Sequence, residues 1–351
     1  MHKAVLINGR SIGNDSLPYI VAEMSGNHNH DLNRALKIVD AAKAAGADAV
    51  KLQTYRADTI TIDHDSDEFM VKGGLWDGRR LYELYEEAHT PWEWHKPIFD
   101  HAKKIEITVF SSPFDATAVD FLEELDAPAY KIASPELVDF PLIQRVAKTG
   151  KPIILSTGAA TLLEIEEAIE VARMAGAREL IVLHCTAAYP APPEEANLAT
   201  ISELARRFNV VTGLSDHTLG TTVASMAAGL GASFIEKHFT LSRSDGGVDS
   251  AFSLEPQELK KLVSTTRIAR AAVGAPMFEP TKSESSVIRN RRSLYAVKPI
   301  AKGEFFTTEN VRSIRPANGL HPKYFNFVIG GHASRDVAFG EPLTLEMIET
   351  K

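Results

Sequence analysis

The segments VVTGLSDH, residues 210–217, and FIEKHFT, residues 234–240, decide the fold, because each joins a short apolar run directly to residues that can do chemistry. Six earlier segments have the same form: YIVAEMS (19–25), DAVKLQT (48–54), ITVFSSP (107–113), AYKIASPE (129–136), PIILSTG (152–158) and LIVLHCT (180–186). Strands that are buried on both faces read as continuous runs rich in Val, Ile and Leu. Eight such runs predict a (β/α)8 TIM barrel, an α/β fold whose active site lies where the strands end.

Polar residues gather at the ends of these eight runs. They are Glu23, Lys51, Gln53, Ser112, Lys131, Ser134, Glu136, Ser156, Thr186, Ser215, His217 and His238. Any one of them is explained as an ordinary polar residue that caps a strand. Their presence at all eight ends is better explained by an active site, because the carboxyl ends of barrel strands meet on one face.

Helical patterns separate the predicted strands. The segment LNRALKIVDAAKAAG follows Asp31, a good N-cap residue, and it closes on Gly46, which suits a helix end. Similar patterns follow each later run, and strict alternation of strands and helices is typical of a parallel barrel. We therefore expect residues 1–280 to form the barrel domain.

The pattern changes after about residue 280. Residues 281–292 are polar and lack periodicity, which indicates a linker, and Arg289, Arg291 and Arg292 form a basic cluster within it. Residues 293–351 read as short strands broken by turns such as RPANG, and they predict a small, mainly β domain. A domain of this size is marginally stable alone, so we expect it to dock on a barrel.

Composition excludes several classes of protein. With 351 residues, 44% of them hydrophobic, the chain has ample material for a large core. A net charge of −8 argues against nucleic acid or an anionic membrane as the main partner. No segment approaches the roughly 20 apolar residues of a membrane span, so a cytoplasmic protein is expected. The single cysteine, Cys185, lies inside an apolar run and is interpreted as a buried structural thiol.

One connection, residues 54–106, is too long for an ordinary barrel loop. Its aromatic residues include Trp76, Tyr82, Tyr85, Trp92 and Trp94. An insertion after a barrel strand lies on the catalytic face, so it predicts a lid that supplies aromatic surface to a sugar or nucleotide. Alternatively these residues pack an extra helix on the barrel, which we favour for Trp92 and Trp94 because they follow a proline and precede an apolar helix.

His217 and His238 follow adjacent strands, within reach of one metal ion. Imidazole suits first-row divalent ions, with water or substrate filling the remaining positions. Either residue is also explained as a structural histidine or a general base. Glu23, Glu136 and Asp249 belong to the same face, where they would accept hydrogen bonds around the metal or bind its water.

Lys51 and Lys131 follow the second and fourth strands. Ser112, Ser134, Ser156 and Ser215 accompany them. Cations and hydroxyl donors together suit a phosphate and a carboxylate. The competing interpretation is a lysine that forms a Schiff base, as in barrel aldolases. Lys237 lies within a strand and is expected to pair with a carboxylate.

Several ordered segments resemble the sialic acid synthase family along nearly the whole chain. They are AEMSGNHNHDL, GADAVKLQTY, SSPFD, PAYKIASPE, GKPIILSTG, LHCTAAYP, GLSDHTLG and IEKHFT. The carboxyl-terminal segment resembles the antifreeze-protein-like (SAF) domain of that family. Within the family, GGLWDGRRLYELYEEAHTPWEWHK is most similar to the pseudaminic acid synthases.

The resemblance implies that phosphoenolpyruvate (PEP) condenses with an open-chain acylamino deoxy sugar to give a nine-carbon ulosonic acid and phosphate. It implies a divalent metal, Mn, Mg or Co, bound by His217 and His238, and Glu23 and Glu136 as the groups that orient water and the aldehyde. The PEP ligands implied are Lys51, Ser112, Lys131, Ser134, Ser156 and Ser215, and the sugar-side residues are Gln53, Tyr189, Asp249 and Arg315. A homodimer is implied, in which Arg315 of the SAF domain enters the neighbouring subunit's site.

One position departs from the family pattern. Sialic acid synthases carry Asn where this chain has Ala187. The missing amide removes a hydrogen bond on the phosphate or sugar side, which argues against N-acetylmannosamine as the substrate and favours the pseudaminic acid branch. Synthesis of N-acetylneuraminate or legionaminate is the alternative, and an aldolase or a non-catalytic carbohydrate-binding protein is more remote.

Overall fold

The computed structural model describes residues 4–349, and its larger part is a closed barrel of eight parallel strands. The strands, in spatial order, are β3 (Tyr19–Glu23), β4 (Ala49–Thr54), β5 (Thr108–Pro113), β6 (Tyr130–Ile132), β7 (Ile153–Ser156), β8 (Leu180–Cys185), β9 (Val211–Asp216) and β10 (Phe234–His238). Pairing of β10 with β3 closes the barrel and places His238 opposite Glu23. The predicted TIM barrel is confirmed.

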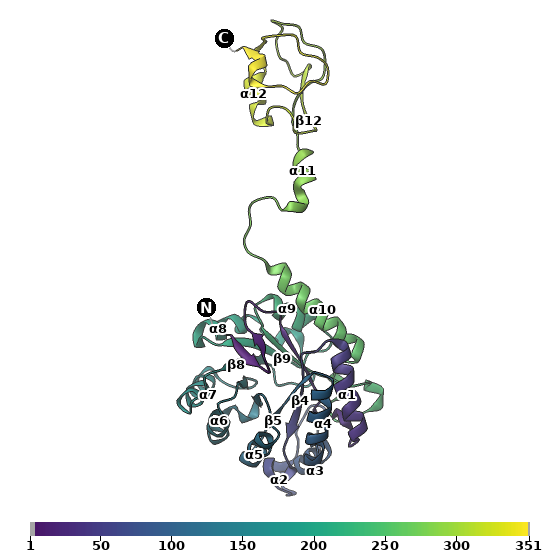
Figure 1. The fold of residues 1–351 in the computed structure, drawn as a ribbon, viewed down its shortest axis with the longest axis vertical. Helices are drawn as coiled ribbons and strands as arrows, with labels where there is room; N and C mark the ends of the chain where they lie inside the picture. The colour runs from purple at the N-terminus through teal and green to yellow at the C-terminus, as the bar shows by residue number, and fades with distance from the viewer. Residues whose placement is uncertain (1–3, 350–351) are drawn as a thin grey trace. The chain divides into compact units, whose positions relative to one another are not determined.

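Helices surround the strands on the outside of the barrel (Figure 1). They are α1 (Leu32–Ala45), α4 (Trp92–Lys104), α5 (Ala116–Glu124), α6 (Phe140–Ala147), α7 (Leu162–Met174), α8 (Ala199–Phe208), α9 (Thr222–Gly229) and α10 (Pro256–Val273). The Asp31 side chain accepts a hydrogen bond from the Asn33 amide at 2.8 Å and begins α1. Gly46, at φ 90°, ends that helix. Both predicted ends of this helix are therefore confirmed.

The insertion after β4 contains α2 (Ala57–Ile60) and α3 (Leu81–Ala88) before it enters α4. The Trp92 ring stacks on Phe121 with centroids 4.6 Å apart, and Trp94 packs edge-on against His28 at 5.5 Å. Both tryptophans therefore pack the barrel, as the alternative interpretation of the insertion predicted. Trp76 lies elsewhere, beside Tyr189, which follows β8, and Phe252, which follows β10.

The barrel interior is apolar below the strand ends. A hairpin of β1 (Val5–Ile7) and β2 (Arg10–Ile12) places Val5, Ile7 and Ile12 in one buried cluster with inward-facing strand residues such as Tyr19 and Phe234. Successive strand residues point to opposite faces, so the inward positions on β10 are residues 234, 236 and 238. The floor of the barrel is thus filled, and the charged side chains of the interior lie toward the carboxyl ends of the strands.

The chain divides into two compact units between Gly274 and Ala275. The second unit contains α11 (Ser285–Arg289), β11 (Ser293–Ala296) paired with β12 (Val311–Ile314), α12 (Phe325–Val328), and β13 (His332–Ala333) paired with β14 (Ile348–Glu349). Its own core includes Leu294, Phe306 and Leu343, which are fully buried. The finer limits expected from sequence, a linker at 281–292 and a domain at 293–351, stay a prediction.

Between residues 4 and 349, none of the helices combines the length and the apolar character that crossing a bilayer requires.

Candidate active site

Inward-facing polar residues on seven of the eight barrel strands form one layer. We call this layer the polar ring: Glu23, Lys51, Ser112, Lys131, Ser156, Ser215 and Glu236. All seven side chains are buried. Each lies at or next to the carboxyl end of its strand, where a barrel presents its active site. Six of the seven were predicted from sequence, and the structure brings those six together.

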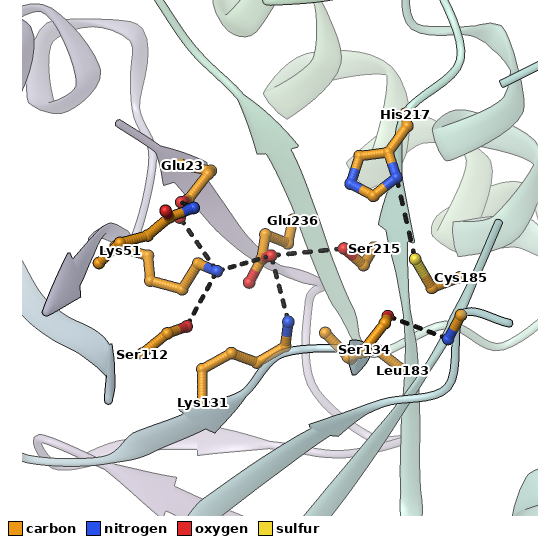
Figure 2. A network of polar contacts seen from close by, with 12 residues as sticks. Glu23, Lys51, Ser112, Lys131, Ser134, Leu183, Cys185, Ser215, His217 and Glu236 are labelled. Atoms are coloured by element: carbon orange, nitrogen blue, oxygen red, sulfur yellow. Dashed lines mark hydrogen bonds and ion pairs between the residues drawn. The ribbon is translucent and has the colours of Figure 1, made fainter. Parts of the chain in front are cut away.

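Glu236 lies at the centre of the ring and was not predicted (Figure 2). Its Oε1 atom lies 3.1 Å from Lys51 Nζ and 3.4 Å from Lys131 Nζ, and it accepts a hydrogen bond from Ser215 Oγ at 3.3 Å. Its Oε2 atom is buried and has no hydrogen-bond partner. One carboxylate oxygen therefore holds both lysines, while the other is left to face the site.

Lys51 joins Glu236 to the next part of the ring. Its Nζ atom lies 3.1 Å from Glu23 Oε2 and donates a hydrogen bond to Ser112 Oγ at 3.3 Å. The amide of Gln53 donates to Glu23 Oε1 at 2.9 Å. Lys51, Gln53 and Glu23 thus form one connected network on two adjacent strands, as Figure 2 shows for Lys51 and Glu23.

Burial and ion pairing oppose each other in this network. Burial raises the pKa of Glu23 to about 7, although Lys51 lowers it. For Lys51, burial is outweighed by Glu23 and Glu236, which raise its pKa. For Glu236, burial is outweighed by Lys131 and Lys51, which lower the pKa. For Lys131, burial lowers the pKa by more than the negative charge of Glu236 raises it.

Ser134 and Glu136 lie in the turn after β6. Ser134 is the N-cap residue of the 3-10 helix Pro135–Val138, and Glu136 lies within that helix. Ser134 Oγ accepts a hydrogen bond from the Gly158 amide at 3.0 Å. A Cβ atom on Gly158 would lie 2.7 Å from Ser134 Oγ and 2.9 Å from Ala187 Cβ, so only glycine permits this approach. Burial raises the pKa of Glu136 to about 7, and its Oε2 atom has no hydrogen-bond partner.

His217 and His238 lie one step nearer the mouth than Ser215 and Glu236, since each follows two residues later. Their ring centroids are 5.4 Å apart. His217 Nδ1 donates to the Thr186 carbonyl oxygen at 2.9 Å, which leaves its Nε2 lone pair free. His238 Nδ1 is buried without a hydrogen-bond partner, and Asp249 Oδ2 lies 3.8 Å from it.

These two imidazoles fit a divalent metal whose other positions are filled by water or substrate. Donation from His217 Nδ1 to a backbone carbonyl is the usual way to fix the tautomer of a metal-binding histidine. Over residues 4–349 no group of three or more His, Cys, Asp or Glu side chains is arranged to hold a metal ion. Asp249 instead accepts a short hydrogen bond from Ser25. The metal assignment therefore stays a prediction.

Aromatic side chains surround the two histidines. The Tyr189 ring lies 4.3 Å from His217, and Phe252 lies 4.8 Å from His238. Trp76, from the long insertion, lies 5.5 Å from Tyr189 and donates its indole N–H to the Val248 carbonyl at 3.0 Å. The insertion thus adds Trp76 to Tyr189 and Phe252, and we call these three side chains the aromatic wall. Phe252 was not predicted, because nothing in its local sequence sets it apart from a core residue.

Some predicted residues lie outside this site. Thr186 Oγ1 donates to the Glu195 carbonyl at 3.1 Å. Lys237 pairs with Asp216 at 2.8 Å on the outer face of the strands, which confirms the expected carboxylate partner. Arg315 is exposed in the second unit, directly after β12, and its role in a neighbouring subunit stays a prediction. Cys185 is buried, as expected, with its Sγ atom 3.9 Å from His217 Nδ1.

Comparison with known proteins agrees with this architecture. The NeuB family model matches residues 38–277, and the SAF domain model matches residues 291–349. The chain is 47% identical to the pseudaminic acid synthase of Campylobacter jejuni and 44% identical to that of Helicobacter pylori, in each case over 95% of this chain and 98% of the relative. The N,N'-diacetyllegionaminic acid synthase of C. jejuni is 40% identical over 90% of this chain and 96% of the relative.

A solved structure is similar as well. The N-acetylneuraminic acid (sialic acid) synthetase from Leptospira borgpetersenii superimposes with a TM-score of 0.73 at 32% identity, covering 82% of this chain and 96% of that one. The resemblance seen in the sequence motifs is confirmed by these matches. The chain belongs to the NeuB family and carries an SAF domain after its barrel.

Proposed function

We propose that this protein is a pseudaminic acid synthase, which condenses PEP with 2,4-diacetamido-2,4,6-trideoxy-L-altrose and water to give pseudaminic acid and phosphate. The relatives named for this activity match at 47% and 44% identity over nearly their whole length. The structural observation that carries the proposal is the polar ring, in which two buried lysines share one carboxylate oxygen directly below two imidazoles.

The ring suits the anionic groups of PEP. Lys51 and Lys131 supply positive charge, and the hydroxyls of Ser112, Ser134, Ser156 and Ser215 supply donors. Ser156 Oγ is buried and has no hydrogen-bond partner, so it is free to donate to a ligand. Charge-assisted hydrogen bonds from lysine to phosphate or carboxylate are about twice as strong as neutral ones. We assign these six residues to PEP on that basis.

The reaction forms one carbon–carbon bond and replaces the bond between C2 of PEP and the phosphate oxygen with a bond between C2 and the oxygen of water. C3 of PEP attacks the aldehyde carbon of the open-chain sugar, and the aldehyde oxygen takes a proton. Water adds to C2 of PEP and loses a proton, and the resulting tetrahedral centre expels phosphate. Groups already oriented toward the developing charges lower the barrier to such steps.

Glu23 and Glu136 are suited to move these protons. Burial raises the pKa of each carboxyl to about 7, so each exchanges a proton near neutral pH. Glu136 Oε2 has no hydrogen-bond partner of its own, which leaves it open to a substrate or water. We assign Glu23 and Glu136 to the orientation and deprotonation of water and the protonation of the aldehyde oxygen.

His217 and His238 would hold the divalent metal, Mn, Mg or Co, which when bound acts as a Lewis acid toward the aldehyde oxygen. Asp249, next to His238, is placed to contact the sugar or the metal's water. Gln53 and Tyr189 are assigned to the sugar as well. We further propose a cytoplasmic homodimer in which Arg315 of one subunit completes the sugar site of the other.

The aromatic wall supports a 6-deoxy sugar. Tyr189, Phe252 and Trp76 present apolar surface beside the histidines, which suits a methyl group better than a hydroxymethyl group. Each hydroxyl that is buried there without a partner costs roughly 1–3 kcal/mol. A more hydroxylated sugar such as N-acetylmannosamine is therefore expected to react at least tenfold less efficiently.

Phosphate release from PEP tests the proposal. Catalytic efficiency is measured at saturating PEP and metal with the trideoxy-L-altrose substrate, N-acetylmannosamine and the legionaminate precursor as acceptors. Preference for the first sugar supports the proposal, and equal or better use of either other sugar overturns the assignment of substrate. The aldolase alternative is checked with pyruvate and borohydride, because burial lowers the pKa of Lys131 toward that of an imine-forming amine. If borohydride traps pyruvate covalently on Lys131 in the absence of PEP, the aldolase reaction replaces the condensation with PEP as the assigned function.

A further inference from the structure

Asp216 and Lys237 form a buried ion pair on the helix-facing side of the barrel wall. Lys237 Nζ lies 2.8 Å from Asp216 Oδ2, and the two side chains are 1% and 2% exposed. Lys237 Nζ also donates to the Thr218 carbonyl oxygen at 2.6 Å, and Asp216 Oδ1 accepts from the Thr218 amide at 2.9 Å. Every charge in the cluster is thus paired, and the chain on both sides of His217 is fixed to it.

The position of the pair in the strand register links it to the two histidines. Asp216 and Lys237 are direct neighbours across β9 and β10, and they form the last pairing between these two strands. Each precedes a histidine: His217 directly follows β9, and His238 is the last residue of β10. Because successive strand residues point to opposite faces, the ion pair lies behind the wall while both imidazoles point into the barrel.

A buried ion pair contributes little to stability. Taking both charges out of water costs as much as their attraction returns, and apolar replacements of similar volume are often neutral or stabilising. The pair at Asp216 and Lys237 therefore requires another explanation. The ion pair connects β9 to β10 at their last paired residues, directly before the two histidines. Its hydrogen bonds to the Thr218 backbone also fix the turn that follows His217.

We propose that Asp216 and Lys237 act together as positioning residues, which set the spacing between the His217 and His238 imidazoles that a divalent metal requires. This inference rests on the metal site of the proposed function. It assigns a role to two residues that do not touch PEP, sugar or metal. Groups that orient metal ligands in this indirect way typically change metal affinity by 10- to 100-fold when they are removed.

The test measures the binding of Mn²⁺ to metal-free protein by electron paramagnetic resonance or calorimetry. The double variant D216N/K237M removes both charges together, and Asn keeps an acceptor for the Thr218 amide. We expect its Mn²⁺ dissociation constant to rise roughly 10- to 100-fold. Its melting temperature is expected to equal or exceed that of the wild type, because no unpaired charge is left behind.

A control lies at the opposite end of the strands, in the ion pair of Arg10 and Asp48, whose side chains are 39% and 18% exposed. Arg10 Nε is 3.4 Å from Asp48 Oδ1, and Asp48 Oδ2 accepts from the Ile20 amide at 2.9 Å. The variant R10M/D48N is expected to bind Mn²⁺ as the wild type does. At saturating metal, D216N/K237M is also expected to keep its KM for PEP within roughly twofold, because the polar ring is untouched.

Two results overturn the inference. If the wild type binds Mn²⁺ and D216N/K237M binds it equally well, the ion pair does not position the imidazoles, and the proposed function stands. If the wild type itself binds no Mn²⁺, the metal site and the role of the pair fail together. Should the double variant not unfold cooperatively, D216N/K237Q replaces it; Gln keeps a donor for the Thr218 carbonyl oxygen, Asn keeps an acceptor for the Thr218 amide, and neither charge remains. Unchanged Mn²⁺ affinity in D216N/K237Q overturns the inference equally.

Discussion

The Nζ atom of Lys51 lies 3.1 Å from Oε1 of Glu236, and both side chains are only 5% exposed. The same oxygen faces Lys131 Nζ at 3.4 Å. Two ammonium groups therefore share one carboxylate oxygen away from water, and Lys51 has Glu23 Oε2 as a second carboxylate partner at 3.1 Å. Glu236 is the carboxylate that lies against both lysines, so it offsets their mutual repulsion in the free protein.

Replacing Glu236 with Gln is expected to destabilise the free enzyme and to increase its dependence on PEP. Removing one partner of a buried ion pair typically lowers the free energy of unfolding by about 3 kcal/mol. PEP then supplies the missing negative charge, so the rise in melting temperature on adding PEP is expected to be larger in E236Q than in the wild type. Thermal unfolding with and without PEP measures both effects.

The control for this prediction is the exposed pair Glu203–Arg206, whose side chains are 47% and 72% exposed. E203Q is expected to change stability by less than about 0.5 kcal/mol. An E236Q protein as stable as the wild type, with no greater response to PEP, would show that Glu236 does not neutralise the lysines.

The stability of the wild type is expected to fall, relative to E136Q, as pH rises from 5 to 7.5. Burial raises the pKa of Glu136 from 4.5 to about 7, so the folded state keeps a proton that the unfolded state has already lost. Ionisation in the folded state is therefore unfavourable, and raising pH through this window lowers the free energy of unfolding, by about 2 kcal/mol. Gln does not ionise, so residue 136 of E136Q makes no such pH-dependent contribution to stability.

Urea denaturation of both proteins at the two pH values tests this. The stability difference between E136Q and the wild type should grow with pH, and a constant difference argues against a raised pKa at Glu136. Activity should show the opposite trend in the wild type, rising toward neutral pH as the carboxylate forms, with kcat reduced in E136Q across the range.

Turnover is expected to require a metal bound through His217 and His238. Chelation should abolish phosphate release, and Mn²⁺ should restore it. H217A and H238A should each lose Mn²⁺ binding, because two imidazoles are the protein ligands and neither alone suffices. His101, which pairs with Asp40 on the surface at 2.7 Å, provides the control variant H101A. Full activity of H217A after chelator treatment would refute the metal assignment.

Arg315 is expected to act in the neighbouring subunit of a homodimer. A heterodimer of R315A with H217A would contain one site with both residues intact if the arginine acts in trans, and would recover roughly half the wild-type activity. It would contain no intact site if the arginine acts in cis. Arg312, also exposed and on β12, gives the control R312A, which should stay active alone. Verified heterodimers without activity would exclude action in trans.

Much of the barrel and of the site follows from the sequence alone. A strand that is buried on both faces must be apolar throughout, so a Glu, Lys or His at its end stands out against the run before it. This contrast identified Glu23, Lys51, Lys131 and His238, and the structure places all four at the carboxyl ends of the barrel strands.

Glu236 escaped the same reasoning because it lies beside Lys237, and adjacent opposite charges look like a local pair. The period of a strand separates them: Glu236 shares the inward face with His238, and Lys237 faces outward to Asp216. Phe252 and the packing of Trp92 on Phe121 depend on segments brought together only by closure of the barrel. The relation of Arg315 to a barrel depends on a second copy of the chain.

Val5, Ile7 and Ile12 fill the amino-terminal end of the barrel. A ligand for Lys131 is therefore expected to enter from the carboxyl ends of the strands, where the rings of His217 and Tyr189 pack with centroids 4.3 Å apart. We therefore expect ordered binding, in which PEP, assigned to the deeper polar ring, enters before the sugar assigned to the level of the histidines. A short hairpin at the far end of the strands, remote from the proposed reacting groups, would thereby set the order in which the substrates bind.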